Sequence, residues 1–400
     1  MIVKTEPVAS LDHWRLFALM LASLAASACS SVGQAADEAE PSEEIASTAD
    51  ELKCPGPDKQ QSTLLGSLGP APGESGATAI NTRGTVVGYS QQGASPDVAR
   101  VHAFRWTAQT GMVDLDPNGL YSTANDVNER EEVAGFAVLA QSPGEPMHAV
   151  VWDAQNRMHD LGTLGGQSSE AVALNNRGQV IGLSETSPSY YRPFIWDAQT
   201  GMVPIDVPAY DVSVSDINDS GTVVGAFDRT YYQSYTPFKW TKEEGVIVLD
   251  TLGSNFGQAS SINRRGDIVG FVYDEGILLD ESGLHEFPPD PRGRPRAVKW
   301  TKHGAWRLPN AANRTKARPK AINDWGLVVG QDDGQINEQD GTETQPPVAL
   351  RWVTAGRFTR PPSVASDRKF NDVNDRGDIV GTSTSGGVSQ ATLWKSRLFW

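Results

Sequence analysis

The sequence is poor in cysteine, in basic residues and in long hydrophobic segments. Two cysteines among 400 residues exclude a disulfide framework and a four-cysteine metal site. Lysine and arginine number 34 against 49 acidic residues, and the net charge of −15 argues against nucleic acid as a partner, because phosphate binding needs a basic surface. The apolar run at residues 16–28 is too short to cross a hydrocarbon core about 30 Å thick as a helix.

The composition is that of a folded, turn-rich chain. Apolar residues make up 38% of the sequence and charged residues 21%, which excludes both a disordered chain and a protein with many membrane spans. The six histidines show no metal-ligand spacing, and no nucleophile-elbow or phosphate-loop motif is found. We therefore assign no metal site, no cofactor and no catalytic residue.

Residues 1–28 have the features of an export signal. Lys4 and Arg15 precede the apolar run, which ends in the small residues Ala-Ser-Ala before Cys29. This arrangement resembles a bacterial lipobox, which implies that Cys29 is lipidated and becomes the first mature residue. We expect an outer-membrane lipoprotein, or a protein of the cell surface or periplasm. The alternative is ordinary cleavage and secretion, with Cys29 removed or left free.

Residues 29–60 are expected to form an acidic, flexible linker behind the lipid anchor. Residues 30–60 contain eight acidic side chains and two lysines, and they offer little apolar surface to bury. Like charges repel and favour an extended chain, so the linker should hold the folded part away from the membrane. Cys54 lies in this segment, either as a free thiol or as the partner of an unlipidated Cys29.

The remaining residues, 61–400, contain one sequence unit that is repeated seven times. Each copy has an Asn followed seven residues later by a Gly, and successive copies are 43 to 60 residues apart. Repeats of this length with strand-like patterning are typical of propeller blades. The seven segments are Asn81–Gly88, Asn128–Gly135, Asn175–Gly182, Asn218–Gly225, Asn263–Gly270, Asn323–Gly330 and Asn374–Gly381.

The Asn-x-x-Gly segment predicts the turn between the first and second strands of each unit. The Asn side chain can accept a hydrogen bond from the backbone two residues on, and Gly suits the left-handed position. The second copy has Glu131 in place of Gly, at a cost of about 1 kcal/mol. We interpret these Asn and Gly residues as turn chemistry, and we expect the later Gly to leave room for a ring from the third strand.

Three copies carry an Asp two residues before the Asn, at Asp126, Asp216 and Asp372. Around Asp372 the pattern is similar to a calcium loop, but Arg376 occupies a ligand position and the bidentate Glu is missing. A calcium site is therefore not expected.

A tryptophan recurs near the end of the third strand of each unit. One indole can bury about 150–250 Å², so seven at equivalent places would hold neighbouring blades at a fixed angle. We interpret them as structural residues; they are Trp106, Trp152, Trp196, Trp240, Trp300, Trp352 and Trp394.

The two ends of the repeated region predict how the ring closes. Only six residues follow Trp394, too few for a turn and a fourth strand, whereas residues 65–69 resemble the fourth strand of the second copy at 161–165. We predict an all-β, seven-bladed propeller of four-stranded antiparallel blades, closed by an N-terminal strand that completes the last blade.

The motif His102-Ala-Phe-Arg-Trp106, combined with Asn-x-x-Gly-x-Val-Val-Gly and Gly-Met-Val-x-Leu, resembles the HAF-repeat family of predicted bacterial extracellular proteins. The resemblance covers residues 62–394. It implies an exported repeat protein, and the family carries no defined activity to transfer.

Length varies only between the second and third strands, because the spacing from each Trp to the next Asn is constant at 22 or 23 residues. These variable loops share one side of the ring, here the loop face, with the connections between blades; the other side is the turn face. Variable loops on a fixed scaffold are common sites of function. Seven tyrosines of the loop face are our candidate ligand-binding residues: Tyr190, Tyr191, Tyr210, Tyr231, Tyr232, Tyr235 and Tyr273.

Aromatic rings with a polar tip favour an unidentified protein, peptide or glycan as the partner, bound by a monomer. The first hypothesis is therefore a ligand- or protein-binding module. One alternative is a polysaccharide lyase or hydrolase that uses His285 with Asp280 or Glu281; another is an envelope scaffold. The sequence favours binding over catalysis and leaves catalysis open.

Overall fold

The computed structural model describes residues 61–69, 73–92, 100–139, 146–229, 235–254, 256–273, 294–311, 316–336, 343–345, 347–355, 358–359, 363–365 and 368–396. The predicted signal peptide, Cys29 and the acidic linker lie outside these residues. Gln60–Trp400 is one compact unit. In the part of the chain that is described, no helix has the length and apolar character needed to cross a membrane.

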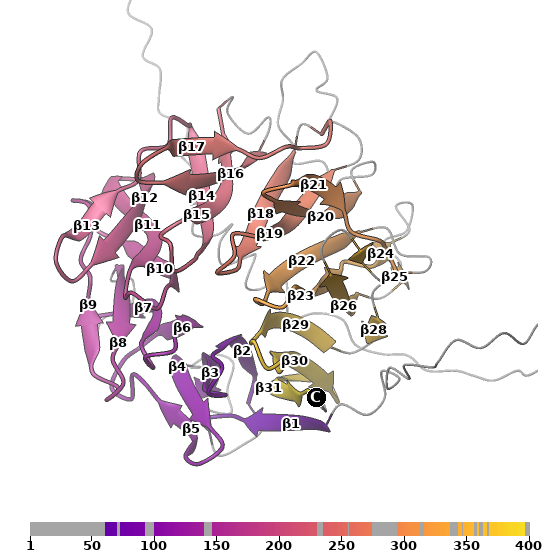
Figure 1. The fold of residues 1–400 in the computed structure, drawn as a ribbon. Helices are drawn as coiled ribbons and strands as arrows, with labels where there is room; N and C mark the ends of the chain where they lie inside the picture. The colour runs from indigo at the N-terminus through magenta and orange to yellow at the C-terminus, as the bar shows by residue number, and fades with distance from the viewer. Residues whose placement is uncertain are drawn as a thin grey trace, which may run out of the picture. The chain divides into compact units, whose positions relative to one another are not determined.

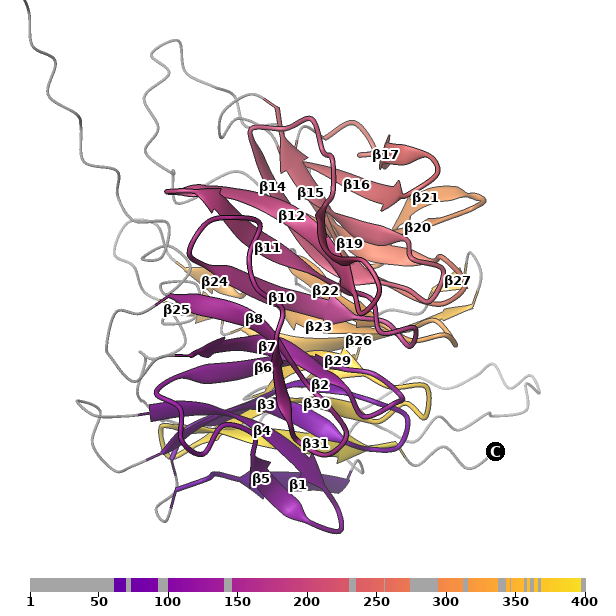
Figure 2. The same ribbon diagram turned by 90° about the vertical axis from the view of Figure 1, so that its left-hand side faces the viewer.

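Seven antiparallel sheets surround a common centre (Figures 1 and 2). Five blades are built from four consecutive strands each: β2 (Ser75–Ile80), β3 (Val86–Gln92), β4 (Arg100–Thr107) and β5 (Gly111–Asp114); β6 (Ser122–Val127), β7 (Val133–Val138), β8 (Met147–Trp152) and β9 (Met158–Asp160); β10 (Ser169–Leu174), β11 (Val180–Ser187), β12 (Tyr190–Asp197) and β13 (Gly201–Pro204); β14 (Asp211–Ile217), β15 (Val223–Asp228), β16 (Tyr235–Thr241) and β17 (Gly245–Val248); β18 (Gly257–Ile262), β19 (Ile268–Tyr273), β20 (Pro295–Thr301) and β21 (Gly304–Arg307).

The sixth blade is the irregular one. It contains β22 (Ala317–Ile322), β23 (Leu327–Asp332) and β26 (Val348–Ala355), and its outer edge is divided between two short strands that both pair with β26, namely β27 (Phe358–Thr359) and β28 (Ser363–Ala365). A separate hairpin of β24 (Gln335–Ile336) and β25 (Glu343–Gln345) lies between β23 and β26 in the chain.

The seventh blade closes the ring through an N-terminal strand as predicted, but that strand is Gln61–Gly66 and overlaps the predicted residues 65–69 only at its end; the matching segment 161–165 likewise follows the fourth strand of the second blade. It consists of β29 (Arg368–Val373), β30 (Ile379–Ser385), β31 (Val388–Lys395) and β1 (Gln61–Gly66). The N-terminal strand β1 pairs antiparallel with β31, with Gln61 opposite Lys395 and Thr63 opposite Leu393. The first strands of successive blades, here the inner strands, contact one another around the centre, and β2 contacts β29. The prediction of a closed seven-bladed propeller is confirmed.

Each inner strand contains a β-bulge three residues before its Asn. The bulge brings an inner-strand carbonyl oxygen so close to the second strand that a Cβ on the facing Gly would lie 1.8 to 2.2 Å from it, as at Gly88 with Gly76 O. The carbonyl oxygen is thus the nearest obstacle to a side chain at each of these glycines. At Gly182 the expected room for a third-strand ring is also found, because a Cβ there would lie 2.8 Å from the Phe194 ring.

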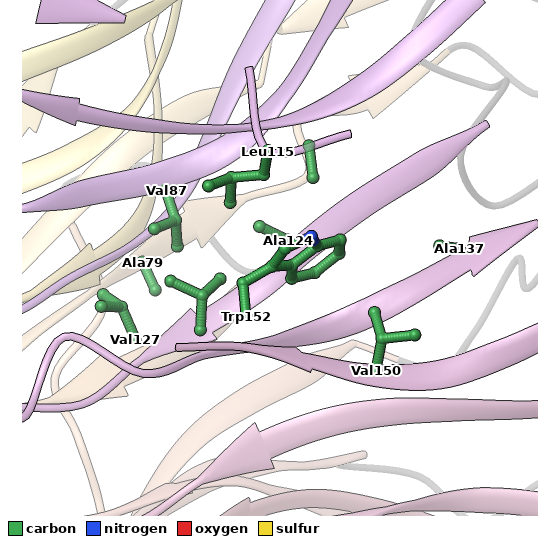
Figure 3. Close-up of a cluster of buried hydrophobic side chains, with 10 residues drawn as sticks. Ala79, Val87, Leu115, Ala124, Val127, Ala137, Val150 and Trp152 are labelled. Atoms are coloured by element: carbon green, nitrogen blue, oxygen red, sulfur yellow. The ribbon is translucent and has the colours of Figure 1, made fainter. Parts of the chain in front are cut away.

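The seven tryptophans lie between blades. Trp152 of the second blade is fully buried and shares a cluster with Ala79, Val87 and Ala103 of the first blade (Figure 3). The other tryptophans occupy the corresponding clusters against the preceding blade, and Trp106 packs with Leu65 of β1 and with the seventh blade. Apolar burial at these contacts holds the sheets together.

The seven turn asparagines form a closed belt of hydrogen bonds. Each Oδ1 accepts from the backbone N–H groups two and four residues on, as in Asn81 with Arg83 (3.1 Å) and Thr85 (3.0 Å), so the predicted turn is confirmed. Each Nδ2 also donates to the carbonyl oxygen of the Asn in the next blade. These bonds run from Asn81 to Asn128 (3.0 Å), to Asn175 (3.1 Å), to Asn218 (3.0 Å), to Asn263 (3.2 Å), to Asn323 (3.2 Å), to Asn374 (2.9 Å) and back to Asn81 (2.9 Å).

Glu131 adopts the left-handed conformation expected for the Gly it replaces, with φ of 66°. Its carboxylate has two partners in the first blade: Asn81 Nδ2 donates to Glu131 Oε1 at 3.1 Å, and Arg83 Nε lies 4.0 Å from the same oxygen. These contacts offset part of the strain.

The belt predicts different effects for two substitutions at one site. Asn323→Ala removes the donor to Asn374 O and the acceptor for the Trp325 and Leu327 N–H groups, and we expect the free energy of unfolding to fall by about 2–4 kcal/mol. Asn323→Asp keeps the acceptor but places an oxygen opposite Asn374 O, and we expect a loss of about 1–3 kcal/mol. Chemical denaturation with the exposed Gln199→Ala as control measures both; wild-type stability in the Asp variant would contradict a stabilising belt.

Two substitutions of Glu131 distinguish the cost of its left-handed backbone from the benefit of its side-chain contacts. Glu131→Ala keeps a side chain at positive φ and loses both partners, so we expect the free energy of unfolding to fall by about 1 kcal/mol. Glu131→Gly loses the same partners but also relieves the strain, and it should stay within about 0.5 kcal/mol of the wild type. Equal stabilities of the two variants, measured by denaturant unfolding, would show that strain at this turn is negligible.

Candidate functional site

The loop face carries two exposed tyrosines on neighbouring blades. Tyr190 begins β12, directly after the tight hairpin from β11, and 51% of it is exposed. Tyr210 lies between β13 and β14 and is 55% exposed; its backbone N–H donates to Asp228 O at 2.7 Å. Among the described members of the predicted set, these two tyrosines are the most exposed to solvent.

Two other predicted tyrosines make internal contacts. Tyr235 donates to Asp211 Oδ2 at 2.6 Å, and its ring lies 5.3 Å from that of Phe256. Tyr273 packs edge-on against Phe256 at 4.9 Å and accepts a hydrogen bond from Arg318 Nη2 at 2.9 Å. Both side chains are half-buried, and their hydroxyl groups are already hydrogen-bonded within the fold.

Of the remaining predicted tyrosines, one is described by the structure and two are not. Tyr191 is half-buried in β12 beside Tyr190 and opposite Glu185 in the strand register. Tyr231 and Tyr232 lie outside the described residues, as do Asp280, Glu281 and His285 of the alternative enzymatic hypothesis. The structure therefore brings Tyr190, Tyr191 and Tyr210 to one pair of blades.

Two tyrosines outside the predicted set lie near the inner strands. The ring of Tyr89 covers Gly76, where a Cβ would approach its Cζ to 2.6 Å. Burial raises the pKa of the Tyr89 hydroxyl, as it does for Tyr121, whose ring stacks on Phe136 at 5.9 Å. Gly76 in the inner strand β2 was the sequence signal that a bulky side chain packs there.

The histidines of the repeat motif pair with acids of the same blade. His102 Nδ1 lies 2.9 Å from Asp114 Oδ2, and His148 Nδ1 lies 2.9 Å from Asp160 Oδ1. His102 is fully buried; burial acts to lower its pKa, but the hydrogen bond and charge of Asp114 outweigh that effect and raise it. These pairs join the third strand to the end of the fourth, and the burial of His102 suits a structural role.

The three aspartates before the turn join neighbouring blades. Asp126 Oδ2 accepts from Leu174 N at 2.9 Å, and Asp372 Oδ2 accepts from Ile80 N at 2.8 Å. Asp216 Oδ2 accepts from Ile262 N at 2.9 Å in the same way. Burial raises the pKa of Asp216 and of Asp372 to about 7, despite the hydrogen bonds that favour their ionised forms.

Glu170 is an inner-strand acid that the sequence reasoning did not select. Burial raises its pKa to about 7, while Asn125 Nδ2 donates to its Oε1 at 3.2 Å. Within the described ranges, no three His, Cys, Asp or Glu side chains lie close enough together to hold a metal ion. The inner strands therefore carry several acids whose pKa is raised by burial.

No protein-family model and no curated protein matches the chain. Among solved structures, the β-propeller domain of the Trilobed protease from Pyrococcus furiosus matches with 7% identity and a TM-score of 0.52, over 80% of this chain and 95% of that domain. TolB from Acinetobacter baumannii (10% identity, TM-score 0.40) matches over 78% of this chain and 80% of its own.

A gluconolactonase from Xanthomonas campestris (8% identity, TM-score 0.40) matches over 85% of this chain and 90% of its own. The Pyrococcus domain is described as having an open velcro topology, whereas here β1 pairs with β31 and closes the ring. At such low identity these similarities concern the fold: the chain is a seven-bladed β-propeller.

Proposed function

We propose that this protein is an exported, lipid-anchored member of the HAF-repeat group that serves as a ligand- or protein-binding module. Export and anchoring rest on the signal-like residues 1–28 and on Cys29. The binding surface is the loop face, because loop length varies there on a scaffold whose other spacings are constant. The partner is a protein, peptide or glycan.

The observation that carries the proposal is the exposure of Tyr190 and Tyr210 on adjacent blades. A tyrosine supplies a large apolar surface and a hydroxyl group at little conformational cost, which suits sugar rings and peptide backbones. The blades beneath are held by the interblade clusters and the Asn belt, so the two rings project from a rigid support. Preorganisation of this kind favours binding.

Substitution of the exposed tyrosines tests the binding surface. On glycan and peptide arrays, Tyr190→Ala with Tyr210→Ala should weaken binding of the recognised ligand at least about tenfold, because truncated aromatic anchors at interfaces commonly cost more than 1 kcal/mol. Trp325→Ala is the matched control, since Trp325 is 65% exposed but lies in the turn between β22 and β23 on the turn face. Binding that survives the tyrosine changes, or that Trp325→Ala weakens equally, would refute the loop-face assignment.

The anchor has an independent test. Mass spectrometry of the mature protein from a bacterial membrane fraction should find Cys29 as the first residue, carrying the mass of a diacylglyceryl group and an amide-linked acyl chain. Cys29→Ala should release the protein from the membrane fraction. An unmodified N-terminus that begins after Cys29 would contradict the anchor and leave the binding proposal standing.

A further inference from the structure

The bulge of each inner strand introduces one extra residue at the same position in every blade. Bulges often redirect a side chain and are frequent near functional sites. Six of the seven bulge residues are half-buried, whereas Lys320 is exposed. The seven are Thr78, Asn125, Val172, Ser215, Ser260, Lys320 and Asn371.

Polar bulge residues elsewhere in the ring bind the next blade. Asn125 Nδ2 donates to Ala171 O at 2.8 Å, and Asn371 Nδ2 donates to Ala77 O at 2.8 Å. Lys320 lies on β22, which β23 covers along one edge and which contacts the inner strands β18 and β29 on either side. Because β23, β18 and β29 surround β22 on these sides, the exposed side chain of Lys320 meets solvent at the centre of the ring.

Two further cations lie on the same pair of contacting inner strands as Lys320, and the charge of each acts on it. Arg318 is two residues away on β22, and Lys369 is on β29 of the next blade. The Arg318 guanidinium is fixed: its Nε donates to Asp333 Oδ2, its Nη2 donates to the Tyr273 hydroxyl, and its Cζ lies 4.5 Å over the Phe271 ring. A preorganised guanidinium loses little freedom when an anion arrives.

Among the described residues, these three cations outnumber the acids whose charge acts on them. Asp333 is the described acid whose negative charge favours the charged form of all three cations. Its carboxylate already accepts hydrogen bonds from Arg318 and, at 2.8 Å, from Gln331 Nε2. Among the described residues, no carboxylate lies within 4 Å of the ammonium group of Lys320 or Lys369. Although solvent reaches Lys320, the surrounding strands restrict its hydration, and this desolvation together with the charge of Arg318 lowers the pKa of Lys320; burial lowers the pKa of Lys369.

We propose that Lys320 and Lys369, beside Arg318, bind an oxyanion, either a carboxylate or a phosphate group, that a polar ligand presents at the centre of the ring. The inference deepens the proposed binding function and rests on it, but it uses different residues from Tyr190 and Tyr210.

Calorimetric titration of the mature protein with citrate and, separately, with inorganic phosphate tests the site. We expect at least one anion to bind, and the combined substitution Lys320→Met and Lys369→Met to weaken that binding at least about tenfold. Lys242→Met is the control, because Lys242 is exposed in the turn between β16 and β17 on the turn face. Citrate binding without phosphate binding identifies a carboxylate site, and the reverse a phosphate site.

Absence of binding by both anions, or equal binding by the double lysine variant, would overturn the inference. The variant with Tyr190→Ala and Tyr210→Ala should still bind the anion. Failure of the lysine site and failure of the loop-face assignment are therefore distinguishable.

Thermal unfolding separates a binding role from a structural one. Removal of two confined cations that lack counterions should raise the melting temperature of the double lysine variant. Lys299→Met should lower it, because Lys299 is 2% exposed and its Nζ lies 3.0 Å from Asp267 Oδ2. A fall in the double variant comparable to that of Lys299→Met would show that Lys320 and Lys369 stabilise the fold, against the inference.

Discussion

A belt of side-chain amides joins every blade of this propeller to the next. Each Asn uses its oxygen to shape its own turn and its nitrogen to reach the backbone of the following turn, so local and long-range structure depend on the same seven residues. The groups are buried, and a missing partner would leave a polar atom without compensation. The belt thus sets the spacing of the inner strands, and the tryptophan clusters fill the wider space further out.

The same geometry explains the second glycine of each repeat. A bulge in the inner strand pushes a carbonyl oxygen against the second strand, where even a methyl group would overlap it. The bulge in turn adds one residue to each inner strand. A structural requirement of the blade has therefore created seven equivalent positions whose side chains are free to differ, and in the sixth blade that side chain is Lys320.

The exposed tyrosines and the cation group lie on different parts of the ring. Exposed tyrosines belong to the loop face of the third and fourth blades, whereas the three cations belong to the inner strands of the sixth and seventh. Several residues that resemble catalytic groups are committed to the fold: His102 is buried against Asp114, and Asp126, Asp216 and Asp372 hold backbone N–H groups of the next blade.

By itself the sequence determined the number of blades, the turn chemistry and the closing strand, because each signal returns seven times and the terminal segments complement each other. It also located the left-handed Glu131. Only the tertiary structure decided that the asparagines bond across blades, that the strand glycines avoid a carbonyl oxygen, and that Arg318, Lys320 and Lys369 come together. The contacts between blades join residues 43 or more positions apart, and the glycine contacts depend on a bulge in the inner strand. A sequence pattern of alternating polar and apolar residues indicates neither long-range contacts nor bulges.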